Sequence, residues 1–479
     1  MTSGPVPDVQ VSGLADNSRD VRPGGLFLAA KGLQRHGLEF AAQAQAAGAA
    51  AIAYEPGAAA LAPPADAVLV PDLGRRRGQI ASRFYEHPSR IMKVCGVTGT
   101  NGKTTTVHLV SRASRLLNLH CGHMGTLGVG LTDPLTPSAL TTPDVLTVHK
   151  RLAWLHEQGA QRVAMEVSSH ALDQGRVDAV QFDTAVFTNL SRDHLDYHPS
   201  LDDYARTKQQ LFTWPRLRHA VLNVDDPVVA AVASVLGPAV KLTAVGADAH
   251  RHARAEHWLR PTDIDARASG IEVCFESSAG RARLSSPLLG GFNATNLLQA
   301  LAVLLAWEVP LDDAVAALGS VASPAGRMET STAPGAPLMV VDYAHTPDAL
   351  ASSVAALRAH CAGELYCVFG CGGDRDRGKR VLMAQAAQAA DHIIVTDDNP
   401  RHEDPDRIVA DTVAGFAADT RYDVIRDRAL AVATAAQRGT ANDIVLVAGK
   451  GHEGYQLVGS ARLAMSDHDL VQQALEART

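Results

Sequence analysis

The sequence predicts an α/β protein of three domains, and three observations lead to this fold class. The chain has 479 residues, which is too long for one ordinary hydrophobic core. Short apolar runs of strand length alternate with stretches that favour helices, an order typical of mostly parallel sheets. Hydrophobic residues make up 46% and charged residues 20% of the chain, so a wholly disordered or fibrous protein is excluded.

The first domain is expected over residues 1–88 as a small α/β unit. Three apolar runs predict strands, at 26–30, 50–54 and 65–71. The Ala-rich stretch 39–47 favours a helix between the first two. Turns or loops are predicted where proline and glycine gather, at 56–64 and 74–78.

The second domain is expected over residues 89–327. An apolar run at 91–97 predicts a strand, and an apparent helix ends near residue 116. Further strands are predicted at 162–167, 182–188 and 220–224. This order predicts a central, mostly parallel sheet with helices beside it.

The third domain is expected over residues 328–479, and its pattern predicts a Rossmann-like, doubly wound sheet. Strands are predicted at 338–341, 365–369, 393–396, 424–425 and 444–447. Helices are predicted between them, at 347–360, 379–390, 405–417 and 429–437. Two stretches near its start, 323–326 and 331–335, are expected to bracket a hinge.

Composition and charge exclude several classes of protein. Lys and Arg number 44 against 51 Asp and Glu, so the net charge of −7 offers no basic footprint for nucleic acid. No run of about 18 apolar residues predicts a membrane span, and the first residues do not resemble a signal peptide. Six scattered cysteines are too few for a disulfide scaffold, which favours a reducing cytoplasm.

The segment after the strand at 91–97 carries the strongest motif, Gly-Thr-Asn-Gly-Lys-Thr-Thr over residues 99–105. Glycines let backbone N–H groups turn toward an anion, and the following helix N-terminus adds partial positive charge. Lys103 can reach the β- and γ-phosphates of a nucleotide. The strict phosphate-loop pattern is missed, because Val97 stands where its first glycine belongs. The position between strand and helix still predicts a P-loop-type domain.

Two further strand ends carry ionisable side chains. Glu166 closes the strand at 162–167, where it would lie at the carboxyl edge of the sheet, beside the phosphate loop. A carboxylate there suits Mg²⁺, although a surface carboxylate is an equal alternative. The segment 188–198 contains His194 among several acids and histidines. Lys208 alone has the character of an ordinary helix lysine.

Together these motifs resemble those of the Mur ligases, ATP-dependent amide-forming enzymes of peptidoglycan precursor synthesis. The resemblance covers nearly the whole chain and includes G-F-N-A-T-N at 291–296, G-R-M-E at 326–329 and D-Y-A-H-T-P-D at 342–348. It implies a cytoplasmic, monomeric enzyme with small-molecule substrates, no nucleic acid and no membrane partner. It also implies a part in cell-wall biogenesis, and so in cell shape, division and the cell cycle.

The resemblance implies the chemistry and the amino acid used. In this family ATP phosphorylates a carboxylate, and an amine attacks the acyl phosphate. The Asn-Pro-Arg form at 399–401 goes with adding meso-diaminopimelate to the D-glutamate γ-carboxylate of UDP-N-acetylmuramoyl-L-alanyl-D-glutamate. This amino acid has one carboxylate more than lysine, and a guanidinium binds a carboxylate through two parallel hydrogen bonds. The family's three domains would bind the uridine nucleotide, ATP and the amino acid, in chain order.

The resemblance also implies the residues of each site. The ATP contacts would be Gly99, Thr100, Asn101, Gly102, Lys103, Thr104, Thr105, Asn293, Asn296, Arg327 and Asp342. The UDP-muramoyl-peptide contacts would be Ser18, Leu33, Gln34, Arg35, Thr141, Thr142, Ser168, Gln174 and Arg176. The diaminopimelate contacts would be Arg375, Asp398, Asn399, Pro400, Arg401, Gly449 and Glu453. The catalytic group would be Lys103, Glu166, His194 and a carbamylated Lys208.

Two Mg²⁺ ions are implied, held by Thr104, Thr105, Glu166, His194 and Lys208. Lys208 lies fourteen residues after His194, the spacing of the family's modified lysine. Carbamylation needs a neutral amine, and hence a lysine whose pKa lies below the ordinary value of about 10.4.

Three alternatives stay open. A lysine-adding ligase of the same family is one, against which Arg401 argues. A folylpolyglutamate-synthase-like ligase is another, which should lack both the N-terminal uridine domain and the Asn-Pro-Arg site. The third is a nucleotide-dependent regulatory protein without ligase chemistry, for which the loop at 99–105 alone would suffice. Turnover of ATP that depends on amine and carboxylate substrates separates the third from the others.

Overall fold

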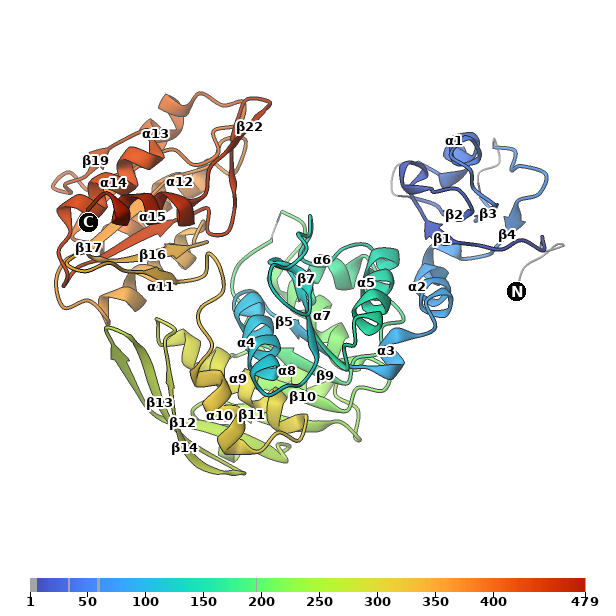
Figure 1. The fold of residues 1–479 in the computed structure, drawn as a ribbon, viewed down its shortest axis with the longest axis horizontal. Helices are drawn as coiled ribbons and strands as arrows, with labels where there is room; N and C mark the ends of the chain where they lie inside the picture. Colours follow the sequence, from blue (N-terminus) through green and yellow to red (C-terminus); the bar gives the residue numbers. More distant parts are fainter. Residues whose placement is uncertain (1–6, 33–34, 58–60, 195, 479) are drawn as a thin grey trace. The chain divides into compact units, whose positions relative to one another are not determined.

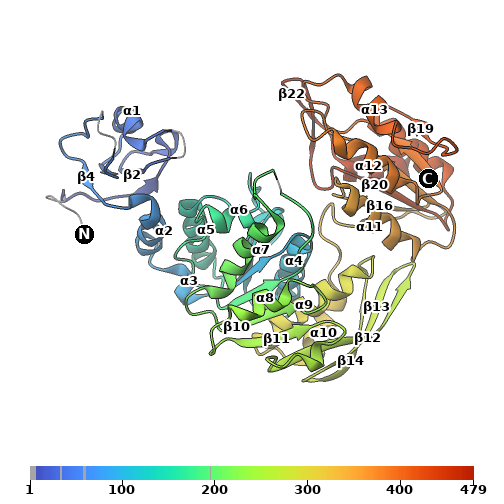
Figure 2. The ribbon, with the colours of Figure 1, turned by 180° about the vertical axis from the view of Figure 1, so that it is seen from behind.

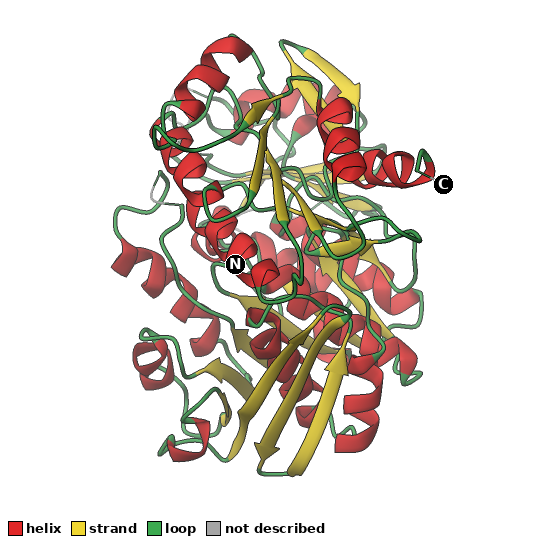
Figure 3. Ribbon diagram, turned by 90° about the vertical axis from the view of Figure 1, so that its left-hand side faces the viewer, coloured by secondary structure: helices red, strands yellow, loops and turns green. Residues whose placement is uncertain are grey.

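The computed structural model of the chain describes residues 7–32, 35–57, 61–194 and 196–478 (Figure 1). Helices and strands occur together throughout, so the α/β fold class is confirmed (Figure 3). The chain divides into two compact units. One contains the chain up to Lys103, Asn118–Leu222 and Asp226–Leu242, and the other contains Thr104–Leu117, Asn223–Asp225 and the chain from Thr243.

The first unit begins with a small parallel sheet of order β1-β2-β3-β4 (Figure 2). Its strands are Gly13–Ala15, Gly25–Ala29, Ala51–Tyr54 and Val68–Leu69. Helix α1 (Ala41–Ala46) lies between β2 and β3 in the chain, as expected, and buried side chains such as Phe27 and Ile52 form the core. The strand β1 was not predicted, because three residues carry too little pattern.

The turn predicted at 74–78 is wrong, because these residues lie within helix α2 (Leu73–Phe84). Gly74 and Gly78 are accommodated in the helix instead of ending it. At Gly78 the helix comes so close to the chain at Asp178 that an added Cβ would lie 2.4 Å from the Asp178 carbonyl oxygen. A close backbone approach, not a turn, explains that glycine.

The rest of the first unit holds the strand order β10-β9-β5-β8-β6-β7. Strands β5 (Lys93–Thr98), β8 (Arg162–Glu166), β9 (Thr184–Phe187) and β10 (His219–Asn223) confirm the predicted runs. They pair in parallel, as does β6 (Cys121–Gly125) with β8, whereas β7 (Gly128–Gly130) is antiparallel to β6. Helices α5 (Val145–Glu157), α6 (Ser169–Asp173) and α7 (Leu201–Gln209) connect or follow these strands, and α3 (Pro88–Ile91) precedes β5.

The second unit contains the helix that follows β5, α4 (Lys103–Leu116), from Thr104 onward. It also contains strands that the sequence reading missed. β12 (His257–Arg267), β13 (Gly270–Ser277) and β14 (Gly280–Ser286) form an antiparallel meander beside β11 (Lys241–Val245). Helices α9 (Phe292–Ala306) and α10 (Leu311–Gly319) follow.

The last part of the second unit is a six-stranded sheet of order β15-β16-β20-β17-β18-β19. Its predicted strands are confirmed as β16 (Leu338–Asp342), β17 (Leu365–Phe369), β18 (His392–Val395), β19 (Asp423–Val424) and β20 (Ile444–Ala448), all parallel. The edge strand β15 (Glu329–Ser331) is antiparallel and was not predicted.

Helices cover both faces of this sheet, which confirms the doubly wound prediction. The core on one face includes side chains of α11 (Pro347–Arg358), α12 (Gly378–Ala387) and α13 (Pro405–Val413). The core on the other face includes side chains of α14 (Arg428–Arg438) and α15 (Asp467–Glu476). A hairpin of β21 (Tyr455–Val458) and β22 (Ala461–Ala464) extends beyond β20. No helix within the described parts of the chain is long and apolar enough to cross a membrane.

Candidate active site

The phosphate loop connects β5 to α4, as the sequence predicted. Gly99 has a φ of +147°, and an added Cβ there would lie 1.8 Å from the Thr188 hydroxyl oxygen, so only glycine fits. The loop is held by Asn189, whose backbone oxygen accepts from the Thr100 N–H at 2.8 Å and whose Oδ1 accepts from the Asn101 N–H at 2.9 Å. The loop is therefore fixed against the end of β9.

Lys103 opens α4, and its side chain folds back over the loop. Its Nζ donates to the carbonyl oxygens of Gly99 at 2.9 Å and Thr100 at 2.7 Å. Thr104 and Thr105 are buried in the first turn of the helix. The Lys103 ammonium is thus bonded to the carbonyl oxygens of its own loop. It would have to leave them to bind a phosphate.

Glu166 ends β8 with its carboxylate buried. Its Oε1 accepts from the Thr126 N–H at 2.7 Å and its Oε2 from the Thr126 hydroxyl at 3.3 Å. The Thr126 hydroxyl also lies 3.0 Å from that of Thr141, and Thr142 donates to the Glu166 carbonyl at 2.8 Å. The Ser168 N–H donates to Thr142 at 3.2 Å. The structure thus brings Glu166 together with three residues expected to contact the muramoyl peptide.

Lys208 is almost fully buried on α7. Its Nζ donates to the Gly99 carbonyl at 2.8 Å, the same oxygen that accepts from Lys103, and lies 4.3 Å from the centre of the Tyr204 ring. Burial, and to a lesser extent repulsion from Lys103, lowers the pKa of Lys208 well below its ordinary value. The environment therefore favours the neutral amine that carbamylation requires.

His194 lies in the loop after β9 and has a left-handed φ of +53°. Partial burial lowers its pKa, which Asp193 partly offsets, so the neutral imidazole is favoured. The ring lies 5.0 Å from that of His170, a neighbour that the sequence did not single out. Among the described residues, no group of three or more His, Cys, Asp and Glu side chains forms a metal-binding cluster.

A cavity of about 620 Å³ in the first unit holds some of the residues expected to bind the UDP-muramoyl-peptide. Arg35, Gln174 and Arg176 line it. The Arg176 guanidinium donates to Gln174 Oε1 at 2.9 and 2.6 Å, which orients both side chains. Ser18 is buried, donates to Gln43 Oε1 at 2.8 Å and does not line the cavity. Leu33 and Gln34 lie outside the described residues.

The remaining residues expected to bind ATP lie in the second unit. Asn293 and Asn296 are buried on α9 and joined by a hydrogen bond of 2.8 Å. The Arg327 guanidinium lies 4.6 Å from the centre of the Tyr343 ring. Asp342, at the end of β16, accepts from the Met328 N–H at 3.1 Å and the Ser353 hydroxyl at 2.6 Å. Both carboxylate oxygens of Asp342 therefore already accept a hydrogen bond from a neighbouring residue.

A second cavity, of about 170 Å³, lies at the carboxyl ends of strands in the six-stranded sheet. Six of the seven residues expected to bind diaminopimelate line it, namely Arg375, Asp398, Asn399, Arg401, Gly449 and Glu453. Pro400 does not. Tyr343, His345 and Lys379 also contribute to the wall. The cavity therefore presents cations and carboxylates together, as a zwitterionic ligand requires.

Lys450 is a fully buried side chain behind this cavity that sequence reasoning did not single out. Its Nζ donates to Asn399 Oδ1 at 3.1 Å and to Glu453 Oε2 at 3.2 Å. The Asn399 amide in turn donates to Glu453 Oε2 at 3.1 Å. Lys450 thus orients two of the cavity's polar side chains. The only signal in the sequence was its place in Gly-Lys-Gly-His-Glu at 449–453.

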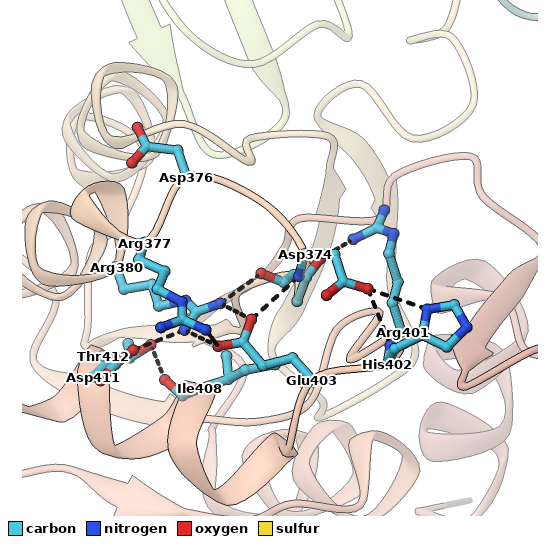
Figure 4. Close-up of polar contacts among 12 residues, drawn as sticks. Asp374, Asp376, Arg377, Arg380, Arg401, His402, Glu403, Ile408, Asp411 and Thr412 are labelled. Carbon is cyan, nitrogen blue, oxygen red and sulfur yellow. Dashed lines mark hydrogen bonds and ion pairs between the residues drawn. The ribbon is translucent and has the colours of Figure 1, made fainter.

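Arg401 is held by both its backbone and its side chain. Its φ is +53°, and its N–H donates to the Leu457 carbonyl at 2.9 Å, on the hairpin strand β21. Its Nη1 donates to the Gly373 carbonyl at 2.8 Å. Nearby, the buried Arg380 is bonded to Glu403, another pair that the sequence reading missed (Figure 4).

Hydrogen bonds from Arg380 lower the pKa of Glu403 to about 2. A carboxyl whose pKa is depressed in the folded state stabilises the fold above its unfolded pKa, near 4.5, and loses that stabilisation as the pH falls toward 2. Glu403→Gln should therefore show a smaller fall of the thermal midpoint between about pH 4.5 and pH 3 than the wild type. Glu364→Gln, at an exposed ion pair with His392, is the control. Parallel pH profiles for wild type and Glu403→Gln would contradict the assignment.

Comparison with known proteins gives the family. Family models match residues 10–85 (Mur ligase family, catalytic domain), 97–304 (Mur ligase middle domain) and 326–451 (Mur ligase, glutamate ligase domain). A UDP-N-acetylmuramoyl-L-alanyl-D-glutamate–2,6-diaminopimelate ligase of Xanthomonas campestris pv. campestris is 51% identical over 475 residues, which cover 98% of this chain and 95% of the relative.

Solved structures agree. A structure of a ligase with that same name matches with a TM-score of 0.73 and 36% identity, over 98% of this chain and 95% of its own. The folylpolyglutamate synthase of Mycobacterium tuberculosis, complexed with ADP and AMPPCP, shares the fold at a TM-score of 0.60 and 19% identity, over 78% of this chain and 92% of its own. The chain therefore belongs to the Mur ligase family.

Proposed function

We propose that this Mur ligase uses ATP to join meso-diaminopimelate to the D-glutamate γ-carboxylate of UDP-N-acetylmuramoyl-L-alanyl-D-glutamate. The observation that carries the proposal is the cavity of about 170 Å³, where Arg375 and Arg401 lie with Asp398, Asn399 and Glu453. The far end of meso-diaminopimelate carries both an ammonium and a carboxylate. Arginine suits the carboxylate, and Glu453, with Asp398, suits the ammonium. The full-length similarity to a ligase of that name supports the same choice.

The lysine-adding alternative fits this cavity less well. Lysine has no second carboxylate, so binding it would leave the Arg401 guanidinium buried beside the ligand without its partner. A site built to hydrogen-bond a substrate group rejects the analogue that lacks it by about 10⁴-fold. The folylpolyglutamate synthase structure matches 78% of this chain, whereas the structure of the diaminopimelate ligase matches 98%, so the first accounts for less of the chain.

The first chemical step would be transfer of the ATP γ-phosphate to the substrate carboxylate. The phosphate loop at 99–105, with the Lys103 ammonium, would surround the phosphates, with Asn293, Asn296, Arg327 and Asp342 as the other ATP contacts. To reach the phosphates, Lys103 would exchange the carbonyls of Gly99 and Thr100 for phosphate oxygens. Charge neutralisation and alignment supply most of the catalysis in such a reaction.

In the second step the amine of diaminopimelate attacks the acyl phosphate carbon. An amide forms, a proton leaves the nitrogen, and phosphate departs. Thr141, Thr142 and Ser168, linked to Glu166, would hold the peptide end of the acceptor. Arg35, Gln174 and Arg176, with Ser18, Leu33 and Gln34, would hold the UDP-muramoyl portion. The first, second and third domains (1–88, 89–327 and 328–479) would then bind uridine nucleotide, ATP and amino acid.

Two Mg²⁺ ions would be held by these residues. Thr104, Thr105 and Glu166 would supply the oxygen ligands that Mg²⁺ prefers, and the carbamate oxygens of a modified Lys208, with the neutral imidazole nitrogen of His194, would supply a second set. Bound Mg²⁺ would neutralise charge on the transferring phosphate. We also propose that the enzyme acts in the cytoplasm as a monomer, on small molecules and without nucleic acid or membrane partners. The net charge of −7 supports the absence of a nucleic-acid partner.

The experiment that tests the reaction class is phosphate release from ATP with substrates omitted in turn. Release should require both the UDP-muramoyl dipeptide and meso-diaminopimelate. Release that is independent of the amine would contradict the ligase proposal and favour a nucleotide-dependent regulatory protein.

Lys103→Met tests the phosphate loop. Methionine has a similar length but no charge, so kcat should fall by about 10²- to 10³-fold as one charge is removed from the phosphates. The measurement is steady-state ADP release, with circular dichroism to confirm that the variant folds. Lys150→Met, at an exposed lysine on α5, is the control for a lysine outside the phosphate loop and should leave kcat and the KM for ATP unchanged. A Lys103→Met variant whose kcat stays within about threefold of the wild-type value would contradict the proposed role of Lys103 in binding the phosphates.

A further inference from the structure

Glu403 follows Arg401 by two residues and gathers donors from two other segments (Figure 4). Arg380 on α12 donates to both carboxylate oxygens, with Nη1–Oε1 at 2.9 Å and Nη2–Oε2 at 2.7 Å. Arg377 lies 3.1 Å from Oε1, and the Asp374 N–H donates to Oε2 at 3.2 Å. Glu403 does not line the diaminopimelate cavity, so its effect on that site is indirect.

The ion pair between Glu403 and Arg380 is buried. The Arg380 side chain is 0% exposed and that of Glu403 is 7% exposed. Arg380 also donates to Asp411 Oδ2 at 2.8 Å and to the Gly372 carbonyl at 3.3 Å. A bidentate pair fixes direction as well as distance, and loss of one partner leaves a buried charge uncompensated. Glu403 is therefore a rigid link between α12, the loop after β17 and the turn that carries Arg401.

The two linked segments touch each other through their backbones. An added Cβ on Gly373 would lie 1.9 Å from the Pro400 carbonyl oxygen, so the loop and the turn are in direct contact. Asp374 and Arg401 both have left-handed φ values, +51° and +53°, which cost energy in residues other than glycine. The Asp374 carboxylate accepts from the His402 N–H at 3.1 Å. Such conformations persist only where neighbouring contacts hold them.

The Gly373 carbonyl completes the chain of contacts from Glu403 to the cavity. Arg401 Nη1 donates to it at 2.8 Å, which sets the direction of the guanidinium. Gly373 adjoins Asp374, whose N–H is bonded to Glu403. The Gly373 N–H also donates to the Asn399 carbonyl at 2.9 Å. Two contacts therefore hold the carbonyl that orients Arg401, and the carboxylate of Glu403 is the charged one.

We propose that Glu403, held by Arg380, is a positioning residue for amino-acid choice. It fixes the loop at 372–377 against the turn at 399–402, and so sets the direction in which Arg401 meets the second carboxylate of diaminopimelate. This inference rests on the proposed function. Because a misplacement of about 1 Å costs about 10²-fold in rate, a loosened turn should be visible as lost selectivity.

The test compares Glu403→Gln with Asp411→Asn, in the full-length protein. Glu403→Gln keeps the shape and removes the charge, and should lower kcat/KM for meso-diaminopimelate by about 10- to 100-fold, mainly through KM. The KM for ATP should change by less than about threefold, and the low kcat/KM for L-lysine should not fall, because lysine has no second carboxylate for Arg401 to bind. Asp411→Asn removes the charge of the other carboxylate that is bonded to Arg380. This variant should preserve the ratio of kcat/KM between meso-diaminopimelate and L-lysine.

An unchanged ratio of kcat/KM between the amines in Glu403→Gln would overturn the inference. So would an equal loss with both amines and a raised KM for ATP, which would leave Glu403 a general structural role. If Glu403→Gln does not fold, Glu403→Asp, which shortens the carboxylate by one methylene, is held to the same criteria. Failure of the proposed function itself is separate, because it would appear as absent meso-diaminopimelate turnover in the wild-type protein.

Discussion

Replacement of Arg401 by alanine is expected to lower kcat/KM for meso-diaminopimelate by about 10³-fold without lowering the low activity with L-lysine. The reason is that the guanidinium, aimed by the Gly373 carbonyl, would bind the carboxylate that distinguishes the two amines. Arg401→Lys keeps the charge but not the two parallel hydrogen bonds, so most of the loss should remain. The measurement is initial-rate phosphate release over a range of each amine.

The control for this prediction is Arg358→Ala, which removes an arginine from an exposed ion pair with Asp391 in the same domain. Exposed pairs contribute little, so this variant should behave as the wild type. An Arg401→Ala variant that still prefers meso-diaminopimelate by the wild-type ratio would show that selectivity resides elsewhere in the cavity.

Replacement of Lys208 by alanine is expected to reduce turnover by about 10³-fold or more. Lys208 and Lys103 both donate to the Gly99 carbonyl, so two ammonium groups would lie close together and repel each other. Carbamylation would replace the charge of Lys208 with a negative one and remove this repulsion. Acetate or formate should partly restore Lys208→Ala, because a small carboxylate fits the space and supplies the missing charge. Lys208→Arg stays cationic and fills that space, so it should be inactive and not rescued.

A second readout for Lys208 does not depend on activity. Native mass spectrometry of the wild type in bicarbonate at mildly alkaline pH should show the added mass of one carbon dioxide, and Lys208→Arg should not. Equal additions to both proteins, or a Lys208→Ala variant with turnover within about tenfold of wild type, would contradict the assignment.

The sequence predicted the third domain best. Its strands are short, buried runs separated by helices of ordinary length, and this pattern depends on local residues alone. The motifs at 372–377, 397–401 and 449–453 lie far apart in the chain, yet six of the seven expected residues line one cavity. They meet because the carboxyl ends of parallel strands share one edge of the sheet.

The missed elements had weaker local signals. The meander of β12, β13 and β14 is half-exposed, and its strands carry many charged residues, such as Arg281 and Arg283 on β14. Lys450, Arg380 and Glu403 were missed for another reason. Each is an ordinary charged residue until tertiary contacts bury it, and burial is not visible in a single sequence.

Placement of the expected UDP-muramoyl and ATP contacts was less complete. Arg35, Gln174 and Arg176 meet in one cavity, whereas Ser18 is turned to Gln43 instead. Asp342 already accepts two hydrogen bonds from its own domain, a use that no strand-end motif reveals. Sequence patterns indicate which residue types stand at a strand end, but not which atoms their side chains already bind.

The selectivity of the cavity that contains Arg401 is tested most directly by a competition between two amines in one reaction. The reaction would contain the protein, ATP, Mg²⁺, UDP-N-acetylmuramoyl-L-alanyl-D-glutamate and equal concentrations of meso-diaminopimelate and L-lysine. The products would be separated and their masses determined by mass spectrometry. We expect the tripeptide product to carry diaminopimelate almost exclusively. Comparable amounts of the lysine product would contradict the role of the arginine cavity, and no product with either amine would contradict the proposed function.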